Sequence, residues 1–386
     1  MNEVSHLPSF DNTKVAFAHK SNFQLRKAQW LFRSFNSNFL LNNGAWLSKL
    51  TIALGLKGII KATIFEQFCG GESMQASETA ISNLNASGIG TILDYSVEGE
   101  ESEDAFDQTA VEVMETIVKA SQDARIPFSV FKVTGIVSFD LLHAQSEGRE
   151  LNETEQVQWE RGKARFNSIC QLAHEKQVRL FVDAEESWIQ DAIDRLTEEA
   201  MSLYNQESCI VYNTLQLYRH DRLAYLKEQT ENSSYHLGFK LVRGAYMEKE
   251  RARALEMGYQ SPIQVDKAST DRDYNVAVQW CLEHPGISCC IGTHNEDSSL
   301  LAAKWLQEQG EMEGSRVYFS QLLGMSDHIS YNLSHSGYNV AKYVPYGPIS
   351  AVMPYLLRRA QENTSAKGQA GRELSLIERE MKRRKQ

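Results

Sequence analysis

Short β-rich runs alternate with amphipathic helical stretches along most of this chain, and the alternation restricts the folds that it can adopt. The β-rich runs are largely apolar and lie at 88–94, 128–134, 179–184, 209–214, 238–243, 289–294, 316–320 and 340–344. Helical periodicity marks segments between them, such as 107–124, 153–175, 188–204, 270–282 and 297–309. Strands that alternate with helices form parallel sheets, and eight nearly continuous apolar strands favour a closed barrel over an open sheet. We therefore predict an α/β fold of the (βα)8 barrel class.

The segments on either side of this alternation have a different character. Residues 22–80 show helical periodicity with few β-branched runs, so we predict an N-terminal helical arm over 1–80. The barrel domain is then expected over 81–365. Residues 366–386 are polar and end in a basic run at 382–385, which predicts a solvated or frayed C-terminal tail.

Composition excludes several classes of partner. The net charge of −10 over 386 residues argues against nucleic acid as the main partner, because no basic excess is available to neutralise phosphates. The cysteines and histidines show no metal-type spacing, so we predict no metal site. The apolar stretch at 46–68 is interrupted by Lys49, Lys57 and Lys61 and cannot be a spanning helix. Its basic face, with Lys57 and Lys61, is compatible with peripheral contact at the inner face of the cell membrane, but packing of its apolar face on the main domain is the favoured interpretation. The chain lacks the pattern of a signal peptide at its start, so we expect a cytoplasmic protein.

Nearly every predicted strand ends in a titratable or amide side chain. These residues are Asp94, Lys132, Asp183 with Glu185, Gln216 with Tyr218, Lys240 with Arg243, Thr293 to Asn295, Gln321 and Tyr343. A single polar residue at a strand end is more often a turn former or a helix cap. In (βα)8 barrels, however, catalytic groups gather at the carboxyl ends of the strands, where burial and mutual charge shift pKa values. The pattern therefore predicts an active site at this end of the barrel.

Two adjacent arginines, Arg358 and Arg359, lie on a predicted helix that is otherwise apolar. They are costly if buried and ordinary if they form a solvated pair on a surface helix. Two guanidinium groups side by side suit a planar carboxylate. Their position after the eighth strand favours a role in binding a carboxylate.

Motifs for other chemistries are missing from the sequence. Gly88 and Gly90 precede a strand and lack a third glycine, so they form no dinucleotide fingerprint, and no phosphate loop, zinc-protease pair or nucleophile elbow occurs. Lys132 at a strand end is compatible with a Schiff-base lyase. The neighbouring carboxylates of Asp183 and Glu185 would instead hold this lysine charged.

Six segments, in this order, resemble proline dehydrogenase. They are 181–186 (FVDAEE), 212–218 (YNTLQLY), 240–248 (KLVRGAYME), 292–295 (GTHN), 321–325 (QLLGM) and 355–363 (YLLRRAQEN). The resemblance covers about residues 80–365, and segments 15–20 and 70–73 resemble the arm of the mitochondrial-type enzymes and their bacterial relatives. The chain resembles the stand-alone form, which implies that pyrroline-5-carboxylate dehydrogenase acts downstream as a separate chain.

The resemblance implies a distorted (βα)8 barrel that binds FAD and oxidises L-proline to Δ1-pyrroline-5-carboxylate, the first step of proline catabolism. A hydride would pass to flavin N5 and the electrons would continue to a quinone. Arg358 and Arg359 would hold the carboxylate of proline. Tyr343, Leu322 and the stem of Lys132 would enclose the ring of proline, and Asp183 would hold Lys132 by an ion pair. Asp94 and Glu98 would meet the arginine pair, with Glu98 as a gate over the bound substrate.

The same resemblance implies the residues that bind the cofactor. They are Asp183, Ala184, Gln216, Lys240, Val242, Arg243, Gly244, Ala245, Tyr246, Thr293, His294, Asn295 and Glu362, the last of which would also orient the arginine pair. Many bacterial members have arginine at the position of Lys240 and lysine at that of Arg243. Because residues three apart on a regular strand face opposite sides, we expect Lys240 near N5 and Arg243 near the outer part of the cofactor. Glycine at 244 would let the backbone approach the cofactor closely.

Other functions stay open at this stage. In hydroxyproline-preferring relatives a small residue replaces Tyr343, so tyrosine favours proline, with a 4-hydroxyproline oxidase as the alternative. A barrel that only binds an imino acid or a flavin is the non-enzymatic alternative.

Overall fold

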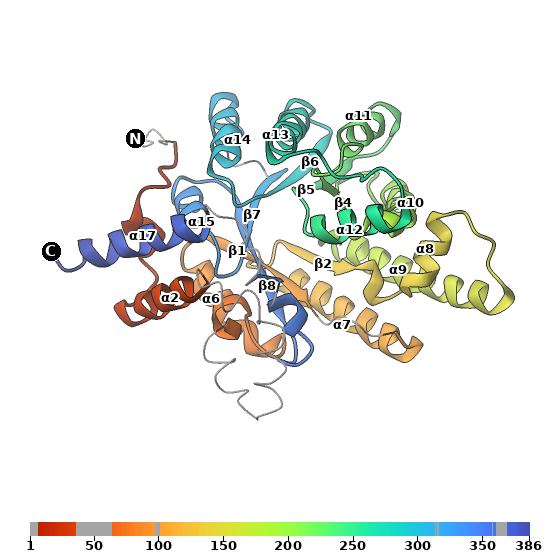
Figure 1. The fold of residues 1–386 in the computed structure, drawn as a ribbon, viewed down its shortest axis with the longest axis horizontal. Coiled ribbons are helices and arrows are strands. Elements are labelled where there is room, and N and C mark those ends of the chain that lie inside the picture. The colour runs from red at the N-terminus through yellow and green to blue at the C-terminus, as the bar shows by residue number, and fades with distance from the viewer. Residues whose placement is uncertain are drawn as a thin grey trace. The chain divides into compact units, whose positions relative to one another are not determined.

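The protein is described here by a computed structural model, which covers residues 7–35, 64–96, 101–312, 314, 316–356, 358–359 and 369–386. These residues contain eight strands, which form a closed barrel in chain order (Figure 1). The strands are β1 (Ile89–Tyr95), β2 (Phe128–Lys132), β3 (Arg179–Asp183), β4 (Val211–Gln216), β5 (Leu237–Val242), β6 (Ile287–Gly292), β7 (Val317–Leu322) and β8 (Val340–Tyr346). Both the (βα)8 class and the eight strands are confirmed. By contact density the chain divides into two compact units, residues 99–319 and residues 1–98 with 320–386.

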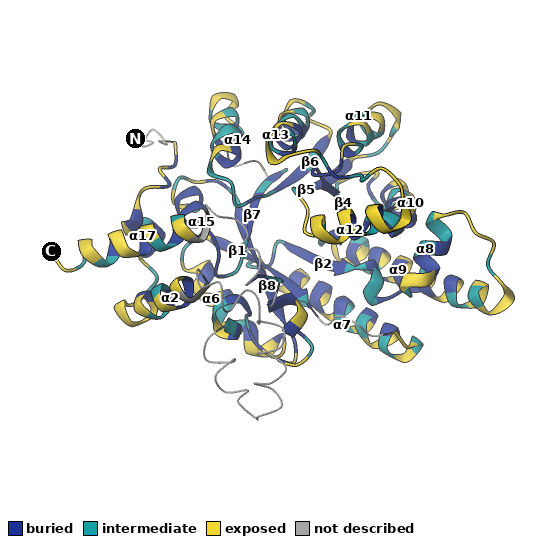
Figure 2. Cartoon of the chain, in the orientation of Figure 1, coloured by how far each residue is buried: buried dark blue, intermediate teal, exposed yellow. Residues whose placement is uncertain are grey.

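The unit of residues 99–319 holds parallel strands with a helix after each. Its helices are α7 (Glu103–Gln122), α8 (Phe139–Ser146), α9 (Glu153–Lys176), α10 (Ser187–Tyr204), α11 (Arg222–Asn232), α12 (Met247–Met257), α13 (Lys267–Glu283) and α14 (Glu296–Gln309). Each helix buries one face toward the strands and exposes the other (Figure 2), as its amphipathic sequence requires. The five helical segments predicted from periodicity all lie within these helices or at their ends.

Aromatic side chains fill the interior between these strands. The ring of Phe128 stacks on Phe181 at 4.3 Å between centroids and meets the edges of Tyr212 and Tyr318 at 5.7 and 4.9 Å. The guanidinium of Arg179 lies over the Phe128 ring at 4.8 Å. These residues alternate with helix-facing residues along each strand, so the barrel interior is a packed core rather than a channel.

The unit of residues 1–98 and 320–386 joins the two ends of the chain. It contains the parallel pair β1 and β8 together with α1 (Thr13–Ala16), α2 (Asn22–Phe35), α5 (Glu66–Phe68), α6 (Glu78–Asn85), α15 (Asp327–His335) and α17 (Gln369–Arg383). The expectation of a solvated or frayed tail at 366–386 is wrong, because residues 369–383 form the helix α17. Glu373, Leu376, Ile377 and Glu380 recur at helical spacing on one buried face of α17.

Helix α17 packs on α2 through an apolar cluster. Leu376 and Ile377 lie in the same cluster as Leu25 and Phe32 of α2. At the end of α17, Arg384 donates hydrogen bonds of 2.7 Å to the backbone carbonyls of Phe17 and Lys20. One residue of the basic run that suggested a solvated tail, Arg384, therefore binds backbone carbonyls in the N-terminal segment, and Arg383 pairs with Glu380.

A buried cluster of charged side chains lies in the same unit. The carboxylate of Asp327, at the start of α15, lies 2.7 Å from Nζ of Lys342 on β8 and 3.0 Å from Nζ of Lys20. Lys342 has no exposed surface, and its Nζ also donates to the carbonyl of Met325 at 2.8 Å. Although burial by itself raises the pKa of Asp327, the ammonium groups of Lys20 and Lys342 outweigh it and hold this pKa well below its ordinary value.

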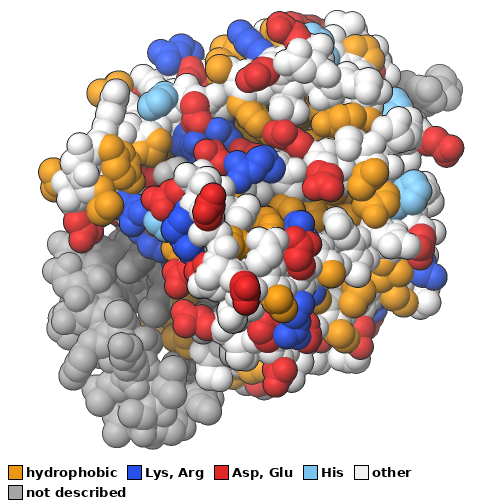
Figure 3. Space-filling view, turned by 90° about the vertical axis from the view of Figure 1, so that its right-hand side faces the viewer, with side chains coloured by type: hydrophobic (Ala, Val, Ile, Leu, Met, Phe, Trp, Pro, Cys, Tyr) orange, Lys and Arg blue, Asp and Glu red, His pale blue; other side chains and the backbone are white. Residues whose placement is uncertain are grey.

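The surface mixes charges of both signs. On the face drawn in Figure 3, acidic and basic side chains are interspersed among polar and apolar ones. No helix in the described part of the chain is long and apolar enough to span a membrane. The predicted basic face at Lys57 and Lys61, the gate residue Glu98 and the helix residue Glu362 lie outside the described residues.

Candidate active site

A buried ion pair joins the carboxyl ends of two strands in the unit of residues 99–319. Nζ of Lys240, on β5, donates to the carboxylate of Asp183, the last residue of β3. Lys240 is only 4% exposed, and its ammonium lies 5.4 Å from the centre of the Phe181 ring. A charge so well buried requires an opposite charge beside it, so Asp183 and the aromatic ring together hold Lys240 in place.

Lys132 ends the neighbouring strand, β2, directly beside this pair. Its Cα is paired with that of Asp183 in the parallel register of β2 and β3. The expected ion pair between Lys132 and Asp183 stays a prediction. The pair formed between Asp183 and Lys240 was not predicted, because sequence alone does not show which interior side chains lean toward each other.

Glu185 is a buried carboxylate near these strand ends that several hydrogen bonds hold in place. It is 4% exposed and accepts hydrogen bonds from the backbone N–H of Thr134 at 3.0 Å and from its hydroxyl at 2.5 Å. Its backbone N–H donates to Gln190 at 2.8 Å, and its carbonyl accepts from Gln216 at 2.6 Å. Burial raises the pKa of Glu185 to about 7, although the Thr134 hydrogen bonds and the charge of Lys132 act in the opposite direction.

The raised pKa of Glu185 predicts a pH-dependent stability. Between about pH 4.5 and 7 the unfolded chain releases the Glu185 proton while the folded chain keeps it, so the free energy of unfolding falls as the pH rises through this window. The total effect is on the order of 3 kcal/mol at most. We expect Glu185→Gln to flatten this slope in denaturant unfolding measured at several pH values. An unchanged slope in the variant would show that other groups cause it.

Arg243 follows β5 and is anchored by protein groups through all three guanidinium nitrogens. Nε donates to Asp271 at 2.7 Å, Nη1 to the hydroxyl of Thr293 at 2.7 Å and Nη2 to Ser298 at 3.0 Å. The guanidinium also stacks on Tyr274 at 4.3 Å. Because β5 ends at Val242, the strand-alternation argument does not extend to Arg243. The side chain joins the segment after β5 to α13 and to the end of β6.

Gly244 has a conformation and surroundings that only glycine fits. Its φ is +126°, and a Cβ at this position would lie 2.5 Å from the ring of Tyr218. The backbone of the two segments is also linked, since the N–H of Tyr218 donates to the carbonyl of Arg243 at 2.8 Å. The structure thus gives a steric reason for glycine here in addition to the predicted approach to a cofactor.

Substitution of Gly244 should therefore be costly. We expect Gly244→Ala to lower the free energy of unfolding by at least about 2 kcal/mol, because the new methyl group meets Tyr218 and the backbone is strained. Gly258 is the matched control, with φ +72° and no atom within 4 Å of a Cβ, and Gly258→Ala should cost about 1 kcal/mol. Chemical denaturation measures both, and equal losses would contradict the close contact with Tyr218.

The segment after β6 has a local structural role as well as a predicted cofactor role. The side chain of Asn295 caps α14 by accepting from the N–H of Ser298 at 2.9 Å. The hydroxyl oxygen of Thr293 accepts a hydrogen bond from the backbone N–H of Asn295 at 3.1 Å and another from the guanidinium of Arg243. Predicted cofactor residues Thr293 and Asn295 are thus rigidly held, and His294 between them is half-buried.

Another set of predicted site residues belongs to the unit of residues 1–98 and 320–386. The predicted cofactor residues Ala184, Val242, Ala245 and Tyr246 lie instead in the unit of residues 99–319. Tyr343 lies on β8 and is 7% exposed, and Leu322 ends β7 and is half-buried. Asp94, near the end of β1, accepts the hydroxyl of Ser96 at 2.7 Å. Residues 353–356 and 358–359 are helical, which supports the predicted arginine helix.

The arginine pair is not a solvated surface pair. Arg359 is 8% exposed, and its guanidinium lies 5.0 Å from the centre of the Tyr355 ring. Arg358 is half-buried. Removal of a guanidinium from water is costly, so a buried guanidinium requires polar or charged partners. Binding of a carboxylate by this pair stays a prediction.

Several residues that shape these strand ends were absent from the sequence prediction. They are Thr134, Gln190, Asp271 and Ser298, which hold Glu185 and Arg243 by hydrogen bonds. Only the position of Thr134, two residues after Lys132, gave a signal. The others lie within helices, where polar residues are too common to single out.

The fold and these strand ends define a (βα)8 barrel with charged and amide groups at the carboxyl ends of its strands. The family model described as proline dehydrogenase matches residues 77–372. The mitochondrial proline dehydrogenase 1 of Dictyostelium discoideum is 31% identical over 99% of this chain and 76% of its own length. CarD, a carbapenem antibiotics biosynthesis protein of Pectobacterium carotovorum subsp. carotovorum, is 35% identical over 82% of this chain and 83% of its own length.

A solved structure agrees at the level of fold. Proline utilization A from Bdellovibrio bacteriovorus, inactivated by N-propargylglycine, matches with a TM-score of 0.69 and 22% identity. The match covers 92% of this chain but only 37% of that much longer chain. The chain belongs to the proline dehydrogenase family and is therefore an enzyme of proline oxidation, the first step of proline catabolism.

Proposed function

We propose that this enzyme oxidises L-proline to Δ1-pyrroline-5-carboxylate with FAD, whose flavin N5 accepts the hydride, and that a quinone takes the electrons onward. The observation that carries the proposal is the group of charges that β2, β3 and β5 contribute, Lys132, Asp183 and Lys240, in a chain of the proline dehydrogenase family. Such a group supplies fixed electrostatics beside a reaction that the cofactor performs.

Two features support a flavin at the predicted cofactor residues. The amide of Gln216 donates to Glu185, and its oxygen has no donor among the described residues, so it can accept from a ring N–H. Arg243 is held in one orientation by Asp271, Thr293 and Ser298, which suits a fixed contact with the outer part of a large cofactor. Asp183, Ala184, Lys240, Val242, Ala245, Tyr246, Thr293, His294, Asn295 and Glu362 complete the proposed set.

The protein's own side chains would orient the substrate. Arg358 and Arg359 are proposed to hold the carboxylate by charge-assisted hydrogen bonds, with Glu98 as a gate. Tyr343, Leu322 and the stem of Lys132 would surround the apolar ring and exclude water from it. Asp183 holds Lys240 in place by an ion pair, so that its donors need no reorganisation during the reaction.

Tyr343 is proposed to set the preference for proline over 4-hydroxyproline. A ring hydroxyl would lie against a bulky side chain instead of in open space. We expect kcat/KM for L-proline to exceed that for trans-4-hydroxy-L-proline by at least about tenfold, and Tyr343→Ser to narrow the ratio. Initial rates with an artificial electron acceptor measure both. A preference of the unaltered enzyme for hydroxyproline would overturn this assignment.

The remaining partners follow from the same proposal. The product would pass to a pyrroline-5-carboxylate dehydrogenase on a separate chain. Electron transfer to a quinone would require the enzyme to act at a membrane surface. We therefore propose a cytoplasmic enzyme with peripheral contact at the inner face of the membrane.

A further inference from the structure

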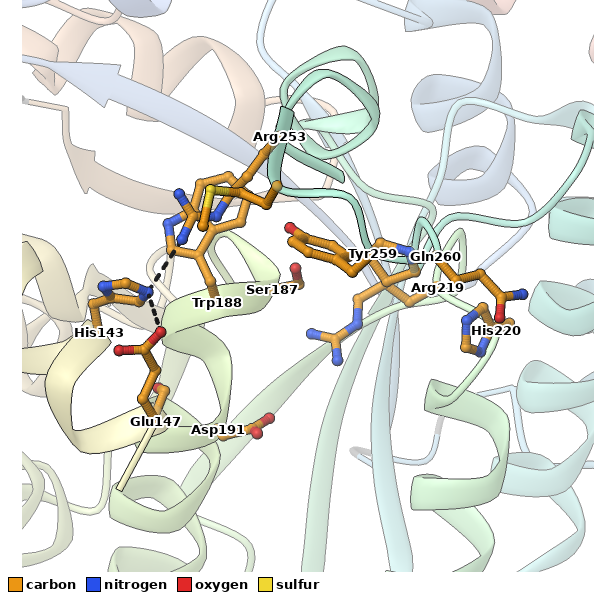
Figure 4. Close-up of a pocket in the computed structure, with 13 residues that line it drawn as sticks. His143, Glu147, Ser187, Trp188, Asp191, Arg219, His220, Arg253, Tyr259 and Gln260 are labelled. Carbon is orange, nitrogen blue, oxygen red and sulfur yellow. Dashed lines mark hydrogen bonds and ion pairs between the residues drawn. The ribbon is translucent and has the colours of Figure 1, made fainter. Parts of the chain in front are cut away.

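A cavity lies within the unit of residues 99–319. It has a volume of about 430 Å³, is open to solvent on one side, and is bordered by α8, α10, the end of α12 and the segments after β4 and after α12 (Figure 4). This size falls within the range of pockets that bind small molecules. None of the residues assigned above to proline or FAD lines it.

Arg219 contributes a buried donor to this cavity. The residue is 6% exposed, and its Nε and Nη2 donate to the carboxylate of Asp221 at 3.0 and 2.7 Å. Nη1 is buried and has no partner among the described residues. Figure 4 shows the guanidinium pointing into the space bordered by Ser187, Tyr259 and Asp191. Because an unsatisfied charged donor is costly, this group is suited to an anionic ligand.

Arg253 lines another wall of the cavity. Its guanidinium stacks on Trp188 at 4.6 Å, which fixes its plane, and its Nη2 lies 3.2 Å from Nε2 of His143. The same His143 nitrogen lies 3.3 Å from the carboxylate of Glu147. Nε of Arg253 is buried without a partner in the described part of the chain. Each of the two guanidinium groups thus has one nitrogen donor without a hydrogen-bond partner among the described residues.

The cavity also has acidic walls that limit what it can bind. Asp191 is exposed and forms neither an ion pair nor a hydrogen bond with any described residue, and Glu147 lies on the same side (Figure 4). Together with Asp221, which pairs with Arg219, these carboxylates outnumber the two arginines of the cavity. A multiply charged anion such as phosphate would be repelled by these carboxylates. A neutral ligand with separated charges satisfies both kinds of group.

We propose that this cavity binds a free amino acid as a zwitterion, with its carboxylate at Arg219 and Arg253 and its ammonium at Asp191. Trp188 and Tyr259 provide aromatic surface for the side chain. The site is distinct from the proline site and does not depend on the chemistry proposed there.

Calorimetric titration of the FAD-loaded enzyme with each standard L-amino acid other than proline tests this. At least one should bind, and its analogues that lack the ammonium or the carboxylate should each bind at least about tenfold more weakly. Asp191→Asn and Arg253→Gln should weaken binding by a similar factor. Arg251→Gln is the matched control, because Arg251 is exposed on the same helix and does not line the cavity.

Three outcomes would overturn the proposal. They are no binding by any of these amino acids, equal binding of the analogue without the ammonium, and unchanged binding in Asp191→Asn. Asp191 is exposed, so its substitution should leave folding intact, and the thermal unfolding midpoint and proline turnover of each variant verify this. Quenching of Trp188 fluorescence by the ligand, lost in Trp188→Phe, places the binding in this cavity.

Discussion

Arg358→Met should raise KM for L-proline by about 100-fold or more while the protein retains FAD. The proposed carboxylate contact is charge-assisted and lies beside Arg359, which is 8% exposed. Loss of one partner of a desolvated ion pair costs about 3–5 kcal/mol, because the other charge stays without compensation. Steady-state kinetics with an artificial acceptor give KM, and the ratio of flavin to protein absorbance gives cofactor content.

A matched variant separates the local effect from a general loss of charge. Arg372 lies on α17 and pairs with the exposed carboxylate of Asp11 at 3.2 Å. Arg372→Met should leave KM within about twofold, since exposed ion pairs contribute little. Loss of FAD from Arg358→Met with proline affinity intact would mean that the helix binds the cofactor instead of the substrate.

Asp327→Asn should be the most destabilising of the substitutions considered, with a loss of about 3–5 kcal/mol in the free energy of unfolding. The change removes the carboxylate from Lys342, which is fully buried, and from Lys20. The ammonium group of Lys342 would then be fully buried with no counter-charge among the described residues, and that of the half-buried Lys20 would lose its partner. Urea unfolding at pH 7 measures the effect.

The pH dependence of the unaltered protein gives a second measurement of this cluster. The folded pKa of Asp327 is depressed, so its stabilisation is present above the unfolded pKa of about 3.8 and is lost as the pH falls through the folded value. Asp11→Asn is the control, because this carboxylate is exposed, and it should cost less than about 1 kcal/mol. Similar losses in the two variants would contradict a structural role for the buried cluster.

Sequence reasoning succeeded where one local pattern determines one structure. The period of the apolar residues identified all eight strands, and the parallel topology then placed polar residues such as Lys132 and Asp183 at strand ends. It failed where the partner lies far along the chain. The pairing of Asp183 with Lys240 depends on which interior side chains are long enough to meet, 57 residues apart.

The C-terminal helix shows a different limitation. Leu376 and Ile377 of helix α17 are fully buried, and Leu374 and Met381 are partly buried against the same cluster. They lie beside the buried carboxylates of Glu373 and Glu380. Glu380 is satisfied by Arg383 and Arg384 one turn later. Because these charges neutralise each other only in the folded helix, the sequence resembles a solvated tail.

The cavity beside α12 could not have been found from the sequence. Its arginines, carboxylates and aromatic residues come from α8, α10, α12 and two connecting segments, and none of them forms a motif. Only the fold brings Arg219 and Arg253 to one space.

The visible spectrum of the purified protein, recorded without oxygen before and after addition of L-proline, tests the central claim most directly. We expect a yellow protein whose visible flavin absorbance falls when proline is added. A colourless protein that gains neither colour nor activity from added FAD would contradict it. So would a bound flavin whose absorbance does not change with proline.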